Sequence, residues 1–333
     1  DFLAARELEM DGKPEQALEL YARAIAKDPG SVYLLRHVAE LSARQGKLTD
    51  ALVYAERALE LDPEAAGVRL FLGTLYRFRR DTEGAVRVLT DATGEPMNRD
   101  AAVLLYGILA DAKRFSEARE VATWLIEEDP EGLRGYVALA DVHEKRGDPA
   151  AAEAVLRQGL EERPGDLALY GALARMRRAR GDRVGEIEIY QEILTHHPGH
   201  HATLLARAEA ELALERSDAA VLTLERVVEN HPDDLRSLLR LAFLRYEREE
   251  FEQAAQLFER ALAKQPEQHE VAYFLGVVRR RLAEHEAARR VFEAIPEEHE
   301  RYADARIQLA GLHERQGEFE QALAEVERAR ALE

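Results

Sequence analysis

Apolar residues along this chain recur at helical spacing, in pairs of stretches joined by short polar breaks. Residues 234–266, DLRSLLRLAFLRYEREEFEQAAQLFERALAKQP, contain one complete pair. In SLLRLAFLRYE and in FEQAAQLFERALAKQ, apolar residues return every three or four positions, which is the spacing of one helix face. The polar break REE separates the stretches, and Pro266 follows the second. The pattern predicts two helices that end at a proline, because proline disfavours helix at the residue before it.

Most of the prolines keep a nearly constant interval. They stand at positions 29, 63, 96, 130, 164, 198, 232, 266 and 296, and successive intervals are 34, 33, 34, 34, 34, 34, 34 and 30 residues. A series of alanines keeps the same register, broken only at Glu186: Ala17, Ala51, Ala85, Ala118, Ala152, Ala220, Ala254, Ala288 and Ala322. Such a period indicates stacked repeats of one helical hairpin, so the length of the chain does not imply two domains.

Small residues mark the turns and the helix crossings of each repeat. Five glycines lie in the polar breaks, where a positive φ closes a turn at low cost: Gly12, Gly46, Gly147, Gly181 and Gly317. On the second helix the periodic alanine is followed four residues later by a large residue, as at Ala254 and Phe258. We expect the small residue at a close helix crossing and the large one in the neighbouring hole.

The 34-residue helix–turn–helix period resembles that of the tetratricopeptide repeat family. The family's Leu-Gly or Leu-Ala pair is present, for example at Leu72-Gly73 and Leu275-Gly276. The resemblance implies an all-α fold, a right-handed α-solenoid of about ten helix–turn–helix repeats in a single array over residues 1–333. The expected repeats cover approximately residues 1–31, 32–65, 66–98, 99–132, 133–166, 167–200, 201–234, 235–268, 269–302 and 303–333.

Three departures from the period predict local irregularities. The fourth repeat slips by one residue near Tyr106-Gly107, and Glu186 replaces the small residue of the sixth repeat. Pro296 comes four residues early, which predicts a short second helix in the ninth repeat and a local change of superhelical pitch.

Composition narrows the range of partners. The net charge of -18 is spread along the chain, so the surface repels phosphate backbones and no nucleic-acid partner is expected. The longest apolar run, residues 101–110, is shorter than the roughly 20 residues of a membrane-spanning helix, so we expect no membrane insertion of this segment. Arginine greatly outnumbers lysine, which indicates a GC-rich, bacterial genome. Compartment is not indicated, and the cytoplasm is slightly favoured over the periplasm.

Four histidines surround one proline of the period, Pro198, in the segment THHPGHH: His196, His197, His200 and His201. Because Pro198 ends a repeat, we interpret the segment as a turn between two repeats. A weak transition-metal site is the alternative, although a turn rarely supplies the fixed geometry that a metal needs.

Motifs for catalysis are absent from the sequence. The chain has no cysteine, no Gly-rich phosphate loop and no HExxH motif, and its many carboxylates fit solvated helix faces. We therefore expect a protein that is not an enzyme and needs no cofactor.

The family resemblance places the binding surface on the first helices, at the second, fifth, ninth, twelfth and thirteenth positions of each repeat. These positions, with their neighbours, predict a partner-binding groove made of Leu70, Phe78, Arg175, Arg178, Leu205, Leu239, Phe243, Tyr246, Tyr273, Val277 and Arg280. The apolar run of repeats seven to nine is either an exposed anchor for a partner or internal packing of a tight superhelix.

The expected function is a non-catalytic scaffold for protein–protein interaction, which binds a peptide, helix or partner protein in the concave groove. Bacterial proteins resembling this one suggest assembly of an envelope, pilus, secretion or polysaccharide-export machine. The alternatives are a substrate-selecting repeat region of a larger enzyme, such as a glycosyltransferase, and a self-assembling structural protein. Because no capping helix follows ERARALE (327–333), we also expect a fragment of a longer protein, or ends covered by another copy.

Overall fold

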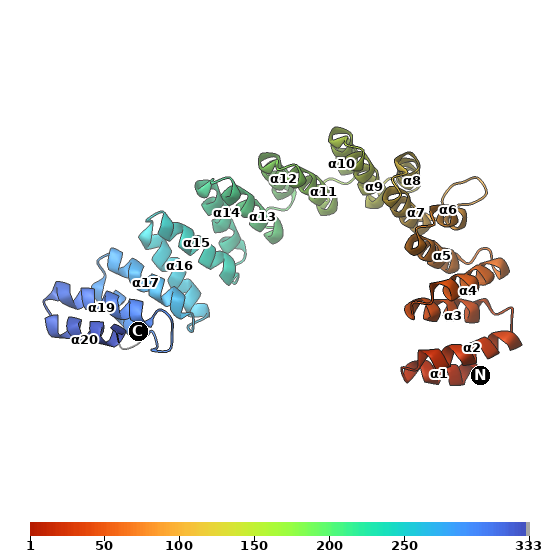
Figure 1. Cartoon of the computed structure of the whole chain (residues 1–333). Helices are drawn as coiled ribbons and strands as arrows, with labels where there is room; N and C mark the ends of the chain where they lie inside the picture. The colour runs from red at the N-terminus through yellow and green to blue at the C-terminus, as the bar shows by residue number, and fades with distance from the viewer. Residues whose placement is uncertain (331–333) are drawn as a thin grey trace. The chain divides into compact units, whose positions relative to one another are not determined.

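The computed structural model describes residues 1–330, which form twenty α-helices joined by short turns (Figure 1). The last three residues of ERARALE, which bear on the expectation about the chain end, lie outside the described residues. The chain divides into two compact units, residues 1–172 and a second unit that begins at Leu173, and each is described by itself. The predicted all-α array of helical hairpins is confirmed.

The first unit contains α1 (Phe2–Met10), α2 (Pro14–Lys27), α3 (Val32–Arg44), α4 (Leu48–Leu61), α5 (Ala66–Arg79), α6 (Thr82–Leu89), α7 (Arg99–Asp111), α8 (Phe115–Glu128), α9 (Leu133–Lys145) and α10 (Pro149–Glu162). The boundary between the units falls within α11 (Leu167–Ala179). The second unit continues with α12 (Arg183–His196), α13 (His201–Ala213), α14 (Ser217–Asn230), α15 (Leu235–Glu247), α16 (Phe251–Lys264), α17 (His269–Arg281), α18 (His285–Glu293), α19 (Tyr302–Gln316) and α20 (Phe319–Arg330).

The two helices of each hairpin are joined through one residue in the left-handed backbone region. The five glycines expected there have φ between 72° and 79°. In the other hairpins the same position has φ between 57° and 60° without glycine: Arg80, Lys113, Glu215, Glu249 and Ala283. A side chain raises the energy of this backbone region by about 1–2 kcal/mol, so five turns of the described chain are strained.

Replacing Ala283 with glycine is expected to stabilise the second unit by about 0.5–1 kcal/mol. Glycine removes the left-handed strain, and this gain exceeds the entropy that glycine adds to the unfolded chain. Urea unfolding measures the change. Ala324→Gly, on an exposed position inside α20, is the matched control and should destabilise by about 1 kcal/mol. Equal effects of the two variants would contradict the assignment of strain.

The core consists of the predicted small-and-large pairs between the helices of a hairpin. A Cβ atom added to Gly73 would lie 2.9 Å from the Leu89 side chain, and one added to Gly276 would lie 2.5 Å from the Phe292 ring. Ala254 is fully buried, as is the Phe258 ring that follows it on α16. Substituents larger than hydrogen at the two glycines would force the facing side chains to move, which explains the Leu-Gly pairs.

The second helices of the third and ninth repeats are short. For the ninth repeat the prediction is confirmed, since α18 has 9 residues against 14 in α16, and buried Ile295 fills the space beyond its end. The shortening of α6 to 8 residues was not predicted, because Pro96 comes only one residue early. A loop follows α6, in which the Asp91 carboxylate accepts hydrogen bonds from the backbone N–H groups of Thr93, at 2.8 Å, and Glu95, at 3.1 Å.

The expected register slip near Tyr106-Gly107 is wrong. The turn residue Lys113 follows the first residue of α7, Arg99, by the same interval that separates Arg80 from Ala66 at the start of α5. The missing residue therefore lies between Arg80 and Arg99, in α6 and its loop. Tyr106 simply occupies a position where other repeats have a small residue, and its hydroxyl donates a hydrogen bond to the Asp141 carboxylate of the next repeat.

Candidate functional site

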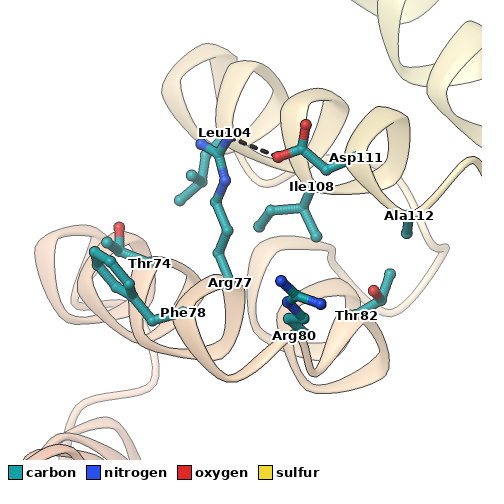
Figure 2. Close-up of a pocket in the computed structure, with 9 residues that line it drawn as sticks. All are labelled: Thr74, Arg77, Phe78, Arg80, Thr82, Leu104, Ile108, Asp111 and Ala112. Carbon is teal, nitrogen blue, oxygen red and sulfur yellow. Dashed lines mark hydrogen bonds and ion pairs between the residues drawn. The ribbon is translucent and has the colours of Figure 1, made fainter.

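A pocket of about 940 Å³ opens between α5 and α7 in the first unit (Figure 2). We call it the groove pocket. Residues on one side of α5 and α7, the residue that follows each of these helices, and the first residue of α6 line it: Thr74, Arg77, Phe78, Arg80, Thr82, Leu104, Ile108, Asp111 and Ala112. On α5, Arg77 and Phe78 follow Thr74 by three and four residues, and on α7, Ile108 and Asp111 follow Leu104 by four and seven, so each set lies on one side of its helix.

The apolar part of the groove pocket combines a buried floor with an exposed ring. Ile108 is buried and Leu104 is half-buried, because α7 turns these residues toward α5. Phe78 is 73% exposed and lies beside Thr74 on α5 (Figure 2). An aromatic ring without cover next to a pocket is an available anchor for an apolar side chain of a partner.

The polar part of the groove pocket carries an excess of positive charge. The Arg77 Nη2 donates to Asp111 Oδ2 at 2.7 Å, which bridges α5 and α7 across the pocket (Figure 2). Both side chains are half exposed or more, so this ion pair adds little stability. The Arg80 guanidinium is exposed and pairs with no described residue. One arginine therefore remains available for an anionic group.

The sequence predicted only part of this pocket. Phe78 lines it, whereas Leu70 is half-buried in the core and its carbonyl accepts a hydrogen bond from the Thr74 hydroxyl at 2.9 Å. The α7 residues were missed because of the supposed slip in the fourth repeat. The spacing of Leu104, Ile108 and Asp111 along one helix face is the signal that could have identified them.

The predicted groove residues of the second unit lie close together but are partly covered. Leu205, Leu239, Phe243, Tyr246 and Tyr273 are all half-buried against core side chains. Their rings contact each other through a shared neighbour, Phe274, whose centroid lies 4.9 Å from that of Phe243, 5.7 Å from that of Tyr246 and 5.6 Å from that of Tyr273. Internal packing thus accounts for part of this apolar surface, and the remainder is accessible.

Val277 is a correction to the predicted groove. Its side chain is only 8% exposed and packs in a cluster with Ala288, Phe292 and Ile295. The reason is the short α18, after which Ile295 and the α19 residues come over this face of α17. Arg280, one turn further along α17, is half-buried, and its Nε has no hydrogen-bond partner among the described residues.

Arg178 stays a proposed groove residue, since its side chain is 51% exposed, but its guanidinium also belongs to an ion cluster around the buried Glu186 carboxylate, which we call the Glu186 ion cluster. Arg178 Nε and Arg183 Nη1 each donate to the Glu186 carboxylate at 2.7 Å, and the Tyr190 hydroxyl donates to it at 2.8 Å. Glu186 is completely buried, so its charge depends on these donors. Arg175, one turn earlier on α11, is exposed and forms no ion pair with the described residues.

Burial and hydrogen bonding act in opposite directions on the pKa of Glu186. Burial alone would raise this pKa, but hydrogen bonds from Tyr190, Arg183 and Arg178 outweigh it, so the pKa lies below its ordinary value of 4.5. The pKa of Tyr190 is raised to about 12, by burial first and then by the adjacent Glu186 carboxylate. The exception in the alanine series is therefore a compensated buried charge.

The histidines of THHPGHH lie in a turn between two repeats, since α12 ends at His196 and α13 begins at His201. His200 Nδ1 lies 2.7 Å from the Thr203 hydroxyl, and His201 Nε2 lies 2.8 Å from Asp234 Oδ2. His196 and His197 also have partners of their own. Over residues 1–330, the structure groups no three histidine or carboxylate side chains in an arrangement that could hold a metal ion.

No described helix combines the length and the apolar character needed to cross a bilayer.

Comparisons with known proteins agree with the repeat architecture. Family models described as tetratricopeptide repeat match residues 2–66, 109–176, 202–234 and 245–301. Among curated proteins, none matches the chain.

Several solved structures are similar to parts of the chain. The MamA protein is 21% identical over 49% of this chain and 88% of its own, with a TM-score of 0.42. A tetratricopeptide repeat protein from Parabacteroides merdae is 17% identical over 74% of this chain and 98% of its own, with a TM-score of 0.41. YrrB, described as a TPR protein with an unusual peptide-binding site, is 19% identical over 57% of this chain and 98% of its own, with a TM-score of 0.38. Since the helical hairpins, their period and the family models agree over most of its length, the chain belongs to the tetratricopeptide repeat family.

Proposed function

We propose that the chain is a non-catalytic scaffold for protein interactions, which binds an extended segment of a partner protein in the groove pocket. The observation that carries the proposal is the position of Phe78. It is a large aromatic side chain, 73% exposed, beside a pocket of about 940 Å³ whose floor is apolar. Buried aromatic anchors in pockets supply much of the free energy of protein association.

The chemistry of the groove pocket indicates what the segment contains. An apolar side chain would enter between Phe78 and Ile108, where it removes apolar surface from water. A carboxylate one or two residues away would reach the unpaired Arg80, and Arg77 could exchange its bond to Asp111 for a bond to the partner. A segment with an apolar residue next to an acidic one therefore complements the pocket.

The aromatic residues of the second unit are proposed as an additional contact rather than as the main anchor. Phe243 and Tyr246 already pack on Phe274, so a partner would cover only their remaining accessible area. We expect Phe243→Ala and Tyr246→Ala to weaken binding less than Phe78→Ala does.

Replacing Phe78 with alanine is expected to weaken partner binding about tenfold or more, because a central aromatic anchor contributes about 2 kcal/mol or more. The measurement is affinity purification from a lysate of the source cells, with mass spectrometry of the retained proteins, followed by titration of the main partner. Folding is unaffected, since the ring makes little contact in the free protein.

Two further variants sharpen this experiment. Phe319→Ala is the matched control, because Phe319 is also a highly exposed phenylalanine, at 69%, but belongs to α20 and does not line the groove pocket. Arg80→Gly removes the unpaired charge while glycine keeps the left-handed turn. Retention of the same partners by wild type, Phe78→Ala and Arg80→Gly would overturn the proposal, as would an equal loss in Phe319→Ala.

A further inference from the structure

A second cavity, of about 630 Å³, lies on the other side of α7, next to the loop that replaces the end of α6. We call it the loop cavity. Thr90 and Pro96 of the loop, Leu105 and Leu109 of α7, and Trp124 of α8 are among its lining residues. Leu105, Leu109 and Pro96 are buried and make an apolar floor, while Trp124 is half-buried at the wall.

The loop cavity exists because α6 stops early and its loop holds a fixed shape. Thr90 and Pro96 form an antiparallel bridge, and the Met97 N–H donates to the Leu89 carbonyl at 3.0 Å. Within the loop, the Asp91 carboxylate also accepts a hydrogen bond from the Thr93 hydroxyl at 2.6 Å. A loop with this many internal hydrogen bonds does not collapse into the space that a longer helix would fill.

Trp124 stands at a position where other repeats carry arginine. In the second and seventh repeats, Arg57 Nη2 donates to the Pro29 carbonyl at 3.2 Å and Arg226 Nη2 donates to the Pro198 carbonyl at 3.0 Å. Trp124, in the same register of the fourth repeat, instead lines the loop cavity beside the periodic Pro96. The ring packs partly against the core, but the arginines of the second and seventh repeats show that the repeat architecture does not need an aromatic residue at this position.

The rim of the loop cavity is acidic. Glu117 lies on the rim, but its carboxylate is bound by Arg114 at 2.6 Å. The carboxylates of Glu95, Glu120 and Glu127 have no partner among the described residues, and Arg119 is the one cation that lines the cavity. Three free carboxylates around a cavity with an apolar floor and an indole wall create a negative potential that favours a cation.

From this juxtaposition we infer that the loop cavity binds an arginine or lysine side chain on a basic segment of a partner protein. The cation lies over the Trp124 indole, which is the aromatic ring that binds cations best. Glu120 and Glu127 pair with its charge, and the aliphatic part of the side chain covers Leu105 and Leu109. The groove pocket, with its unpaired arginine, attracts the opposite charge, so the two sites take different segments.

The chain contains a single tryptophan, so Trp124 reports on this site directly. In a ¹H–¹⁵N spectrum of the full chain, its indole N–H gives one cross-peak. We expect this peak to shift and saturate on titration with the peptide Gly-Arg-Gly-Arg-Gly and not with Gly-Glu-Gly-Glu-Gly. The affinity should fall as salt rises, because the rim charges are exposed. An equal response to both peptides would overturn the inference.

Variants separate the charges from the ring. Glu120→Gln with Glu127→Gln should weaken binding of a fluorescein-labelled arginine peptide about tenfold, measured by anisotropy. Glu161→Gln, an exposed glutamate at the register of Glu127 in the next repeat, is the control and should change nothing. Trp124→Arg should fold, because arginine is the residue that other repeats use there, and should abolish binding. Unchanged affinity in Trp124→Arg or in the double glutamine variant would contradict the proposed site, and Phe78→Ala should leave it intact.

Discussion

Replacing Phe258 with alanine is expected to lower the free energy of unfolding of the second unit by about 3–5 kcal/mol. The ring is completely buried, with its centroid 5.1 Å from that of Phe243, and it fills the hole beside Ala254. Removing it forfeits the transfer free energy of the ring and leaves a cavity that the two rigid helices α15 and α16 cannot close. Urea unfolding followed by circular dichroism measures the loss.

The loss of stability in Phe258→Ala should be confined to the repeats around α16. In a stack of hairpins each repeat contacts only its neighbours, so amide protection in hydrogen exchange should fall first in α15, α16 and α17. Phe258→Leu, which keeps most of the volume, is the control and should cost less than about 1.5 kcal/mol. A uniform loss of protection over α12 to α20, or a cost below 1 kcal/mol in the alanine variant, would show that the ring is not a core element.

Removing both arginines of the Glu186 ion cluster, in Arg178→Ala with Arg183→Ala, should also cost about 3–5 kcal/mol at neutral pH, because the carboxylate that they compensate is buried. The double variant leaves the completely buried Glu186 carboxylate with only the Tyr190 hydroxyl as donor. An uncompensated buried charge is among the most destabilising changes in a protein. Arg175→Ala with Arg180→Ala, two exposed arginines of the same region, is the matched control and should cost less than about 1 kcal/mol.

The pH dependence of this difference tests its cause. In the wild type the pKa of Glu186 is lowered, so its stabilising contribution is present above the ordinary value of 4.5 and is lost as pH falls through the folded-state pKa. In the double variant burial dominates and the pKa rises above 4.5. The gap in unfolding free energy between variant and wild type should therefore be large at pH 7 and smaller near pH 4. A gap independent of pH would indicate lost packing rather than lost charge compensation.

Much of the fold could be predicted because residues with strong backbone preferences recur with the period of the repeats. Proline ends each pair, and glycine marks half of the left-handed turns. The other turns were hidden, since Arg80 or Glu249 gives no sign of positive φ in the sequence. The short α6 was hidden for a different reason: Pro96 comes only one residue early, while Asp91 and Thr93 replace the end of the helix by side-chain hydrogen bonds.

The candidate site was predicted less well, because assignment to a groove position does not by itself show that a side chain is exposed. Phe78 and Val277 both came from the groove positions, yet one is 73% exposed and the other 8%. The difference depends on the hairpin that follows: α7 leaves a pocket next to α5, whereas Ile295 and α19 cover α17 after the short α18. Arg178 could not be assigned until Glu186 was seen to be buried beside it.

The Glu186 ion cluster also limits which helices of this chain could have been duplicated separately. Arg183 and Tyr190 lie on α12 with Glu186, but Arg178 lies on α11. Among the other described first helices, only α5 and α17 carry arginine at this register, as Arg77 and Arg280, so a copy of α12 placed after any of the rest would carry a buried carboxylate without that guanidinium. Exchange of either helix alone would in most combinations separate Glu186 from Arg178, so we expect duplication and recombination to keep α11 and α12 together.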